Sequence, residues 1–201
     1  MLNRFRRITS DTWFALGLEF VAIVLGVMIA LTMDEWREER EIEHNIAIAM
    51  ERLNDEILLN HSRLLDALPV IEERYARLAA IQVDRERSFA DLVERFGGYR
   101  VPELKDSVWR RVSGDRLANR MPAGYIEAGF RLYNHNELLD SLRLEINDLM
   151  THQNYHDPAQ ASIAKGISLQ IMRQQIVWAR EALAVYDYFI QQHIDPEHSD
   201  E

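Results

Sequence analysis

One long apolar run opens the chain. Residues 13–33, WFALGLEFVAIVLGVMIALTM, are predominantly apolar, with one carboxylate at Glu19. A helix of this length rises about 31 Å, close to the thickness of the hydrocarbon core of a bilayer. Trp13 and Trp36 bracket the run, and amphipathic indole rings favour the two membrane interfaces. The pattern therefore predicts a transmembrane helix over residues 13–33.

Beyond Trp36 the apolar residues return every three or four positions, with charges between them. This spacing predicts that the membrane helix continues as a stalk helix with one buried stripe. The stripe comprises Ile46, Met50, Leu53, Ile57, Leu64 and Ile71. Pro69 cannot donate the helical hydrogen bond, so we expect it to end or kink the stalk helix. A second helix is then expected over residues 70–83.

Shorter helices are expected in the middle of the chain. Ser88 with Asp91 three positions later resembles a capping box, and Gly97-Gly98 should stop the helix that it starts. Further helices are expected over residues 103–112 and 122–150, the second with a pause at residues 134–136.

A long last helix should follow Asp157, an expected N-cap, and Pro158 at the first helical position. It is too polar for a second membrane span and should end near Ile194. The predicted fold is all-α, with a single N-terminal transmembrane helix continuous with a long stalk helix and packed into a soluble helical bundle over residues 34–194. A basic segment, residues 1–12, and an acidic tail, residues 195–201, flank these parts.

Small residues form a stripe along the predicted membrane helix. Glu19, Ala22, Gly26 and Ala30 recur at steps of three and four, so they share one face. Such a face lets a second helix approach closely, although Gly and Ala are also common in membrane helices without this role. Glu19 on the same face either sits protonated against a partner helix or reaches water at the nearby N-terminal interface.

The charges around the span suggest an orientation. Arg4, Arg6 and Arg7 precede it, whereas Arg37 and Arg40 follow it among acidic residues. The positive-inside rule then favours a cytoplasmic N-terminus and a periplasmic C-terminal domain. The apolar run is longer than the core of a cleaved signal peptide and lacks an A-x-A-like site, so we expect an uncleaved signal anchor in a bacterial inner membrane.

Net charge and composition exclude several classes of function. Residues 34–201 hold 20 Lys and Arg against 31 Asp and Glu, an acidic balance that repels phosphate backbones, so no nucleic-acid partner is expected. The chain has no cysteine, which excludes disulfides and thiol chemistry. No catalytic fingerprint or phosphate-binding glycine loop occurs, so we expect no enzyme activity and no cofactor.

Two histidine spacings are candidates for metal sites. His152 and His156 are four apart but lack the glutamate of an HExxH motif, and Glu41 with His44 forms one Glu-x-x-His where a di-iron bundle needs two. We predict no metal ligands. Eight aromatic residues at helical spacings are expected in the core, or else around a ligand cavity. They are Trp109, Tyr125, Phe130, Tyr133, Trp178, Tyr186, Tyr188 and Phe189.

The run EFVAIVLGVMIALTMDEWREER, which begins at Glu19, resembles a family of uncharacterised bacterial single-pass membrane proteins. The matching positions are Leu25, Gly26, Val27, Ala30, Leu31, Trp36, Glu38 and Arg40. The family often has Asn or Gln just before this tryptophan, where the chain has Met33, Asp34 and Glu35. A weaker similarity runs from Val108 to Tyr133. The resemblance implies an anchored all-helical architecture and brings no active site.

We therefore expect an anchored helical interaction protein. Its partners would be the lipid bilayer and, through the small-residue stripe, a second copy or another membrane subunit of an envelope complex. The alternative is a periplasmic ligand-binding or sensor module that works through a partner protein, because about twelve cytoplasmic residues leave no room for an output domain.

Overall fold

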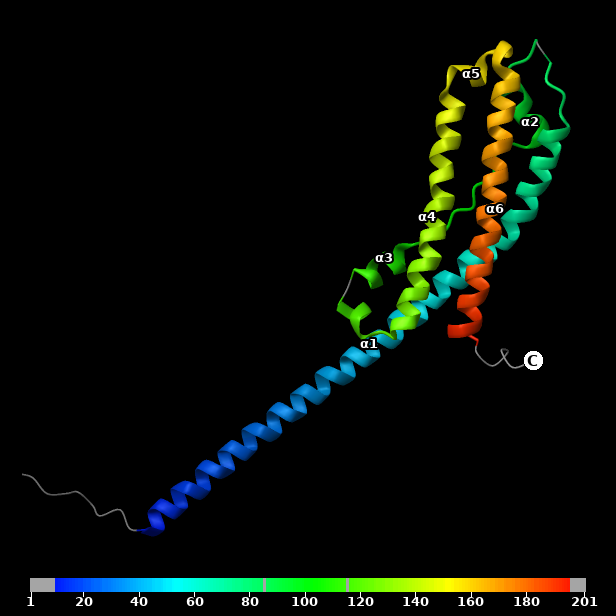
Figure 1. Cartoon of the computed structure of the whole chain (residues 1–201). Helices are drawn as coiled ribbons and strands as arrows, with labels where there is room; N and C mark the ends of the chain where they lie inside the picture. Colours follow the sequence, from blue (N-terminus) through cyan, green and yellow to red (C-terminus); the bar gives the residue numbers. More distant parts are fainter. Residues whose placement is uncertain (1–9, 85, 115, 196–201) are drawn as a thin grey trace, which may run out of the picture. The chain divides into compact units, whose positions relative to one another are not determined.

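The computed structural model describes residues 10–84, 86–114 and 116–195, and in this part of the chain it is all-α, as predicted (Figure 1). No strand occurs among these residues. The chain divides into two compact units, residues 1–47 and 48–201. The α-helices are α1 (Ser10–Ala80), α2 (Val93–Phe96), α3 (Ser107–Ser113), α4 (Ala123–Thr151), α5 (Gln153–His156) and α6 (Ala161–His193). Short 3-10 helices cover Ala90–Leu92, Arg116–Arg120 and Pro158–Gln160.

Helix α1 runs through Pro69 to Ala80, so the expectation that Pro69 ends the helix is wrong, and so is the separate helix over residues 70–83. Pro69 is exposed, and so is Leu65, whose carbonyl loses its helical donor because proline has no amide hydrogen. Water can satisfy that carbonyl on the outer face of the helix. The helix continues past Pro69 because the proline lies on the solvated side of α1, away from the core.

The second unit is a bundle of three long helices: residues 48–80 of α1, α4 and α6. Tyr125 and Tyr133 of α4 bond to Asn54 and Glu56 of α1, so these two helices run in the same direction. Helix α6 runs antiparallel to them. Its pairings with α1 are Asp187 with His61, Arg180 with Glu72 and Lys165 with the carbonyl of Ala79.

The core of this bundle is apolar and well enclosed. The predicted stripe is confirmed at four positions of α1, which are fully buried: Leu53, Ile57, Leu64 and Ile71. Helices α4 and α6 contribute apolar residues that include Leu132, Leu142, Met172, Ala179 and Phe189. Burying each large apolar side chain contributes roughly 1.5–3 kcal/mol, so this stripe stabilises the packing of α1 on the other two helices.

The long connection from α1 to α4 brings the chain back along the bundle, because both helices point the same way. Its first part follows the prediction. Ser88 and Asp91 form the expected reciprocal cap, since the Asp91 carboxylate accepts from the Ser88 amide at 3.0 Å. Gly97 and Gly98 then end α2 with φ of 90° and 70°, a region that side chains other than glycine rarely adopt.

The second part of the connection differs from the prediction. Residues 99–106 form no helix, so the helix expected over residues 103–112 is limited to α3. We call residues 99–106 the strap. Helix α4, in turn, continues through residues 134–136, where a pause was expected. Asn136 there is buried and bonds to the Tyr186 hydroxyl at 2.9 Å, so it supports the bundle instead of interrupting the helix.

The start of the last helix agrees with the prediction. Asp157 accepts from the amide of Ala159 at 2.9 Å, and Pro158 takes the first position of a 3-10 turn that leads into α6. Helix α6 ends at His193, one residue before the expected Ile194. Of the predicted acidic tail, residues 196–201 lie outside the described residues.

Candidate functional site

The predicted small-residue stripe lies on an exposed face of α1. Glu19, Ala22, Gly26 and Ala30 are all in α1 and all exposed. A Cβ added at Gly26 would meet nothing within 4 Å. The small residues are therefore open to a second helix.

Large apolar side chains surround this stripe. Eleven of them between Leu18 and Met33 are 39–68% exposed. Helix α1 is the one described helix long and apolar enough to cross a membrane. Thr32 is no exception to this apolar character, because its hydroxyl donates to the Met28 carbonyl at 2.6 Å within the helix.

Trp36, one of the two predicted interface residues, is partly exposed and packs against a cation. Trp36 is 54% exposed, and the guanidinium carbon of Arg40 lies 3.9 Å from the centre of its ring. A cation over an indole face is a favourable arrangement, and both groups suit a headgroup region. The side chain of Trp13 lies outside the described residues, as do Arg4, Arg6 and Arg7.

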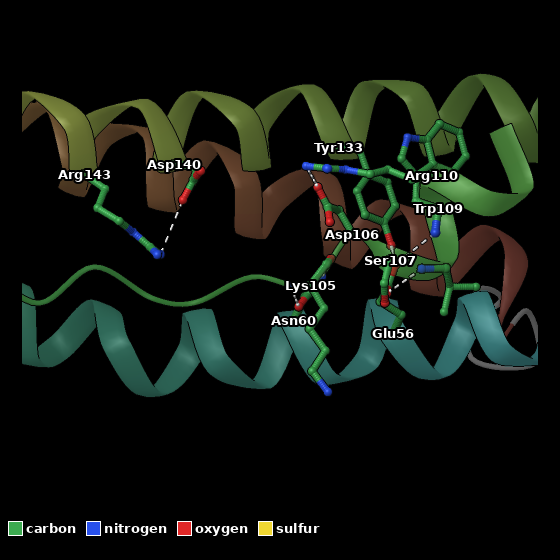
Figure 2. A network of polar contacts seen from close by, with 11 residues as sticks. Glu56, Asn60, Lys105, Asp106, Ser107, Trp109, Arg110, Tyr133, Asp140 and Arg143 are labelled. Carbon is green, nitrogen blue, oxygen red and sulfur yellow. Dashed lines mark hydrogen bonds and ion pairs between the residues drawn. The ribbon is translucent and has the colours of Figure 1, made fainter. Parts of the chain in front are cut away.

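A buried carboxylate joins three elements of the bundle. Glu56 of α1 is 5% exposed. Its Oε2 accepts from the Val108 amide at 2.9 Å and the Ser107 hydroxyl at 3.0 Å, and its Oε1 accepts from the Trp109 amide at 3.2 Å and the Tyr133 hydroxyl at 2.7 Å (Figure 2). The carboxylate thus satisfies free amides at the start of α3 and fixes that helix between α1 and α4.

Tyr133 is the neutral donor in this group. Burial raises its pKa above the ordinary value, and the hydrogen bond to Glu56 raises the pKa further. The phenol therefore keeps its proton. A protonated phenol can go on donating to the carboxylate, which keeps the Tyr133 ring in place.

The strap is held to the bundle by side chains that bond to its backbone. The side chain of Asn60 both donates to the Lys105 carbonyl at 2.6 Å and accepts from the Lys105 amide at 2.7 Å. Arg63 and Arg74 of α1 donate to the carbonyls of Glu103 and Tyr99. Gln175 of α6 donates to a further strap carbonyl. These side chains replace the backbone partners that a helix or sheet would supply.

The spacing of these contacts along α1 indicates an extended course for the strap. Its partners Asn60 and Arg74 lie 14 residues apart on α1, about 21 Å at helical rise. The strap covers this stretch in the six steps from Tyr99 to Lys105, which is close to the 3.3 Å per residue of a β-strand.

A cleft of about 680 Å³ lies between the strap, α3 and α4. Figure 2 shows the strap between α1 and α4, with side chains of α3 and α4 around the space beside it. The cleft is lined by polar residues and by non-polar and aromatic ones, namely Pro102, Leu104, Trp109, Phe130, Tyr133, Leu139 and Leu144. It carries the ion pairs Arg110 with Asp106 at 2.5 Å and Arg143 with Asp140 at 3.3 Å.

The aromatic wall of the cleft depends on one glycine. The Trp109 ring stacks on Tyr133 at 4.9 Å with an angle of 4° and meets the Phe130 ring edge-on at 4.9 Å. A Cβ at Gly129 would lie 2.6 Å from the Trp109 ring. The absence of a side chain at Gly129 therefore lets Trp109 lie flat against α4.

The eight aromatic residues were expected in the core or around a cavity, and Tyr188, 57% exposed on α6, lies outside both the core and the cleft. Phe130 is 50% exposed and lines the cleft, which agrees with the second alternative. Trp178 is half-buried. Trp109, Tyr125, Tyr133, Tyr186 and Phe189 are buried, as expected.

Neither histidine spacing has a metal-like arrangement. His156 lies 3.0 Å from the Met150 carbonyl, and His152 accepts from the Asn154 amide at 3.3 Å. Among the described residues, no group of three His, Asp or Glu side chains could hold a metal ion.

No family model, curated protein or solved structure matches this chain.

Sequence reasoning missed the part of the bundle that holds the cleft. The sequence pattern assigned no role to Glu56 or Asn60, which lie between the apolar positions of the stalk helix. Their spacing carried a signal, because Glu56 lies three residues after Leu53 and Asn60 three after Ile57, which puts both polar side chains beside the buried stripe.

Proposed function

We propose that this protein is a membrane-anchored helical interaction protein. In this proposal it is an accessory or scaffolding subunit of a cell-envelope complex, or a homo-oligomer, in a bacterial inner membrane. It has no catalytic activity of its own. The span over residues 13–33 holds it as a single-pass signal anchor, with the C-terminal domain in the periplasm. The observation that carries the proposal is the exposed apolar surface of α1 from Leu18 to Met33.

The size of that surface supports a lipid environment. Eleven large apolar side chains are about half exposed. Fully burying one such side chain is worth roughly 1.5–3 kcal/mol, so covering the set is worth on the order of 10 kcal/mol. A free energy of this size equals the whole stability of an ordinary domain. This free energy would be gained if lipid covered most of the surface and protein helices covered the rest.

The stripe supports association within the membrane. At about 100° per residue, Ala22, Gly26 and Ala30 fall within one narrow face. A helix that packs there would also cover Glu19, whose carboxyl group is costly to leave against lipid. The partner in this proposal is a second copy of the chain or another membrane subunit.

The test is the size of the assembly in mild detergent. We expect the double substitution Gly26→Leu and Ala30→Leu to abolish the oligomer or complex, because the added side chains hold the helices apart. Val24→Leu with Met28→Leu, on the opposite face, is the matched control and should leave the assembly intact. An assembly unchanged by the stripe substitutions would contradict association through this face.

A further inference from the structure

The strap is not a strand, but at Leu104 it presents to the cleft a backbone that is unpaired among the described residues. In an extended chain, the backbone groups of successive residues point to opposite sides. Glu103 and Lys105 direct theirs towards Arg63 and Asn60 of α1. The amide and carbonyl of Leu104, between them, therefore point away from α1, and Leu104 lines the cleft. No backbone hydrogen bond to Leu104 occurs among the described residues.

The opposite wall of the cleft is apolar at both ends. Phe130 and Leu144 are 50% and 71% exposed, and both line the cleft from α4. They are 14 residues apart, about 21 Å at helical rise. An extended peptide of six residues has nearly the same length, at about 3.3 Å per residue. A strand of that length would reach from one apolar side chain to the other.

The net charge of the cleft favours a positively charged partner. Arg110 and Arg143 are each paired with an aspartate. Glu103 and Glu137 also line the cleft, both are exposed, and neither has an ion-pair partner among the described residues. The cleft is thus left with two uncompensated negative charges, inside a domain that is acidic as a whole. Basic side chains would complement it.

We propose that this cleft binds an extended segment of a partner protein, with alternating apolar and basic residues, which pairs with the backbone of Leu104. This mode of recognition combines backbone hydrogen bonds for affinity with side-chain contacts for specificity. The inference rests on the proposed role as an interaction protein and deepens it by naming the chemistry of the partner.

The test uses the full chain in nanodiscs of neutral phosphatidylcholine, so that a basic probe does not bind the lipid. The probe is fluorescein-labelled Val-Lys-Leu-Lys-Val-Lys-amide, followed by fluorescence anisotropy. We expect saturable binding that weakens with salt. The same peptide with glutamate in place of lysine, or with methylated backbone amides, should not bind, because one loses charge complementarity and the other loses the strand pairing.

Variants at the cleft locate the binding. Phe130→Ser and Leu144→Ser change exposed side chains and should each weaken binding about tenfold, the loss expected for one apolar contact. Val177→Ser, at a 46% exposed position of α6 outside the cleft, is the matched control and should bind like the wild type. Glu103→Gln with Glu137→Gln should weaken binding at low salt and reduce its salt dependence.

Several outcomes would overturn the inference. These are no binding of the lysine peptide, equal binding of the glutamate peptide, or binding that Leu144→Ser leaves unchanged. Cross-linking of two copies through the cleft would also overturn it, since a second copy would then be the occupant. None of these results depends on the stripe substitutions in α1. A failure of this inference can therefore be distinguished from a failure of the proposed function.

Discussion

Replacing Glu56 with glutamine tests how the bundle holds α3 and the cleft wall. The carboxylate accepts four hydrogen bonds, from the Val108 and Trp109 amides and from the Ser107 and Tyr133 hydroxyls. Glutamine keeps one oxygen and places an NH₂ group at the other position. A hydroxyl facing that NH₂ group can turn and accept, but a backbone amide cannot.

The expected cost follows from this count. Whichever way the amide group is oriented, one of the two backbone N–H groups of α3 loses its acceptor. A buried donor without a partner costs about 1–3 kcal/mol, and the remaining bonds lose their charge assistance. Glutamine is uncharged, so the variant no longer has the desolvation cost of a buried charge, and this offsets part of the loss. We therefore expect Glu56→Gln to lower the free energy of unfolding by about 2 kcal/mol.

Two measurements check this prediction. Urea unfolding gives the free energy, and hydrogen exchange over residues 106–112 reports directly on the amides that Glu56 caps. Glu51→Gln, at an exposed position of the same helix, is the control and should change neither. If Glu56→Gln left both the stability and the exchange unchanged, the carboxylate would not be what holds α3 in place.

Two further substitutions probe the bundle. Gly129→Ala places a Cβ 2.6 Å from the Trp109 ring and should cost about 1–3 kcal/mol in urea unfolding, whereas Gly124→Ala, with open space around it, should be neutral or slightly stabilising. Burial lowers the pKa of His193, which packs on Phe189, below its ordinary 6.5. The unfolded state then binds more protons, so stability should fall as the pH drops below about 6.5, and His193→Gln should flatten that fall in urea titrations. A variant with the same pH dependence as the wild type would refute this assignment.

Local chemistry predicted much of this fold. The apolar run, the stripe from Leu53 to Ile71 and the cap formed by Ser88 and Asp91 depend on neighbours within a few residues, so the sequence shows them directly. The prediction that Pro69 ends the helix was wrong for a related reason. Its local effect is well known, but whether water can reach the carbonyl of Leu65 depends on which side of the bundle that turn faces.

The cleft depends on contacts between distant residues. The strap keeps an extended form because Asn60 captures the backbone of Lys105, 45 positions away. Local propensity favoured a helix from residue 103 and could not include that contact. Glu56 likewise becomes a buried acceptor only once α3 is placed against it. Its position beside Leu53 was a local signal, but the identity of its donors was not.

The central claim is that the chain is anchored in a membrane and works by association. The most direct measurement is the mass and composition of the full-length protein solubilised in mild detergent from alkali-washed membranes. We expect the protein to stay with the membranes and to elute as an assembly larger than one chain, with either a second copy or foreign subunits in fixed proportion. Recovery in the alkaline wash, or elution as a single chain without partners, would contradict the account.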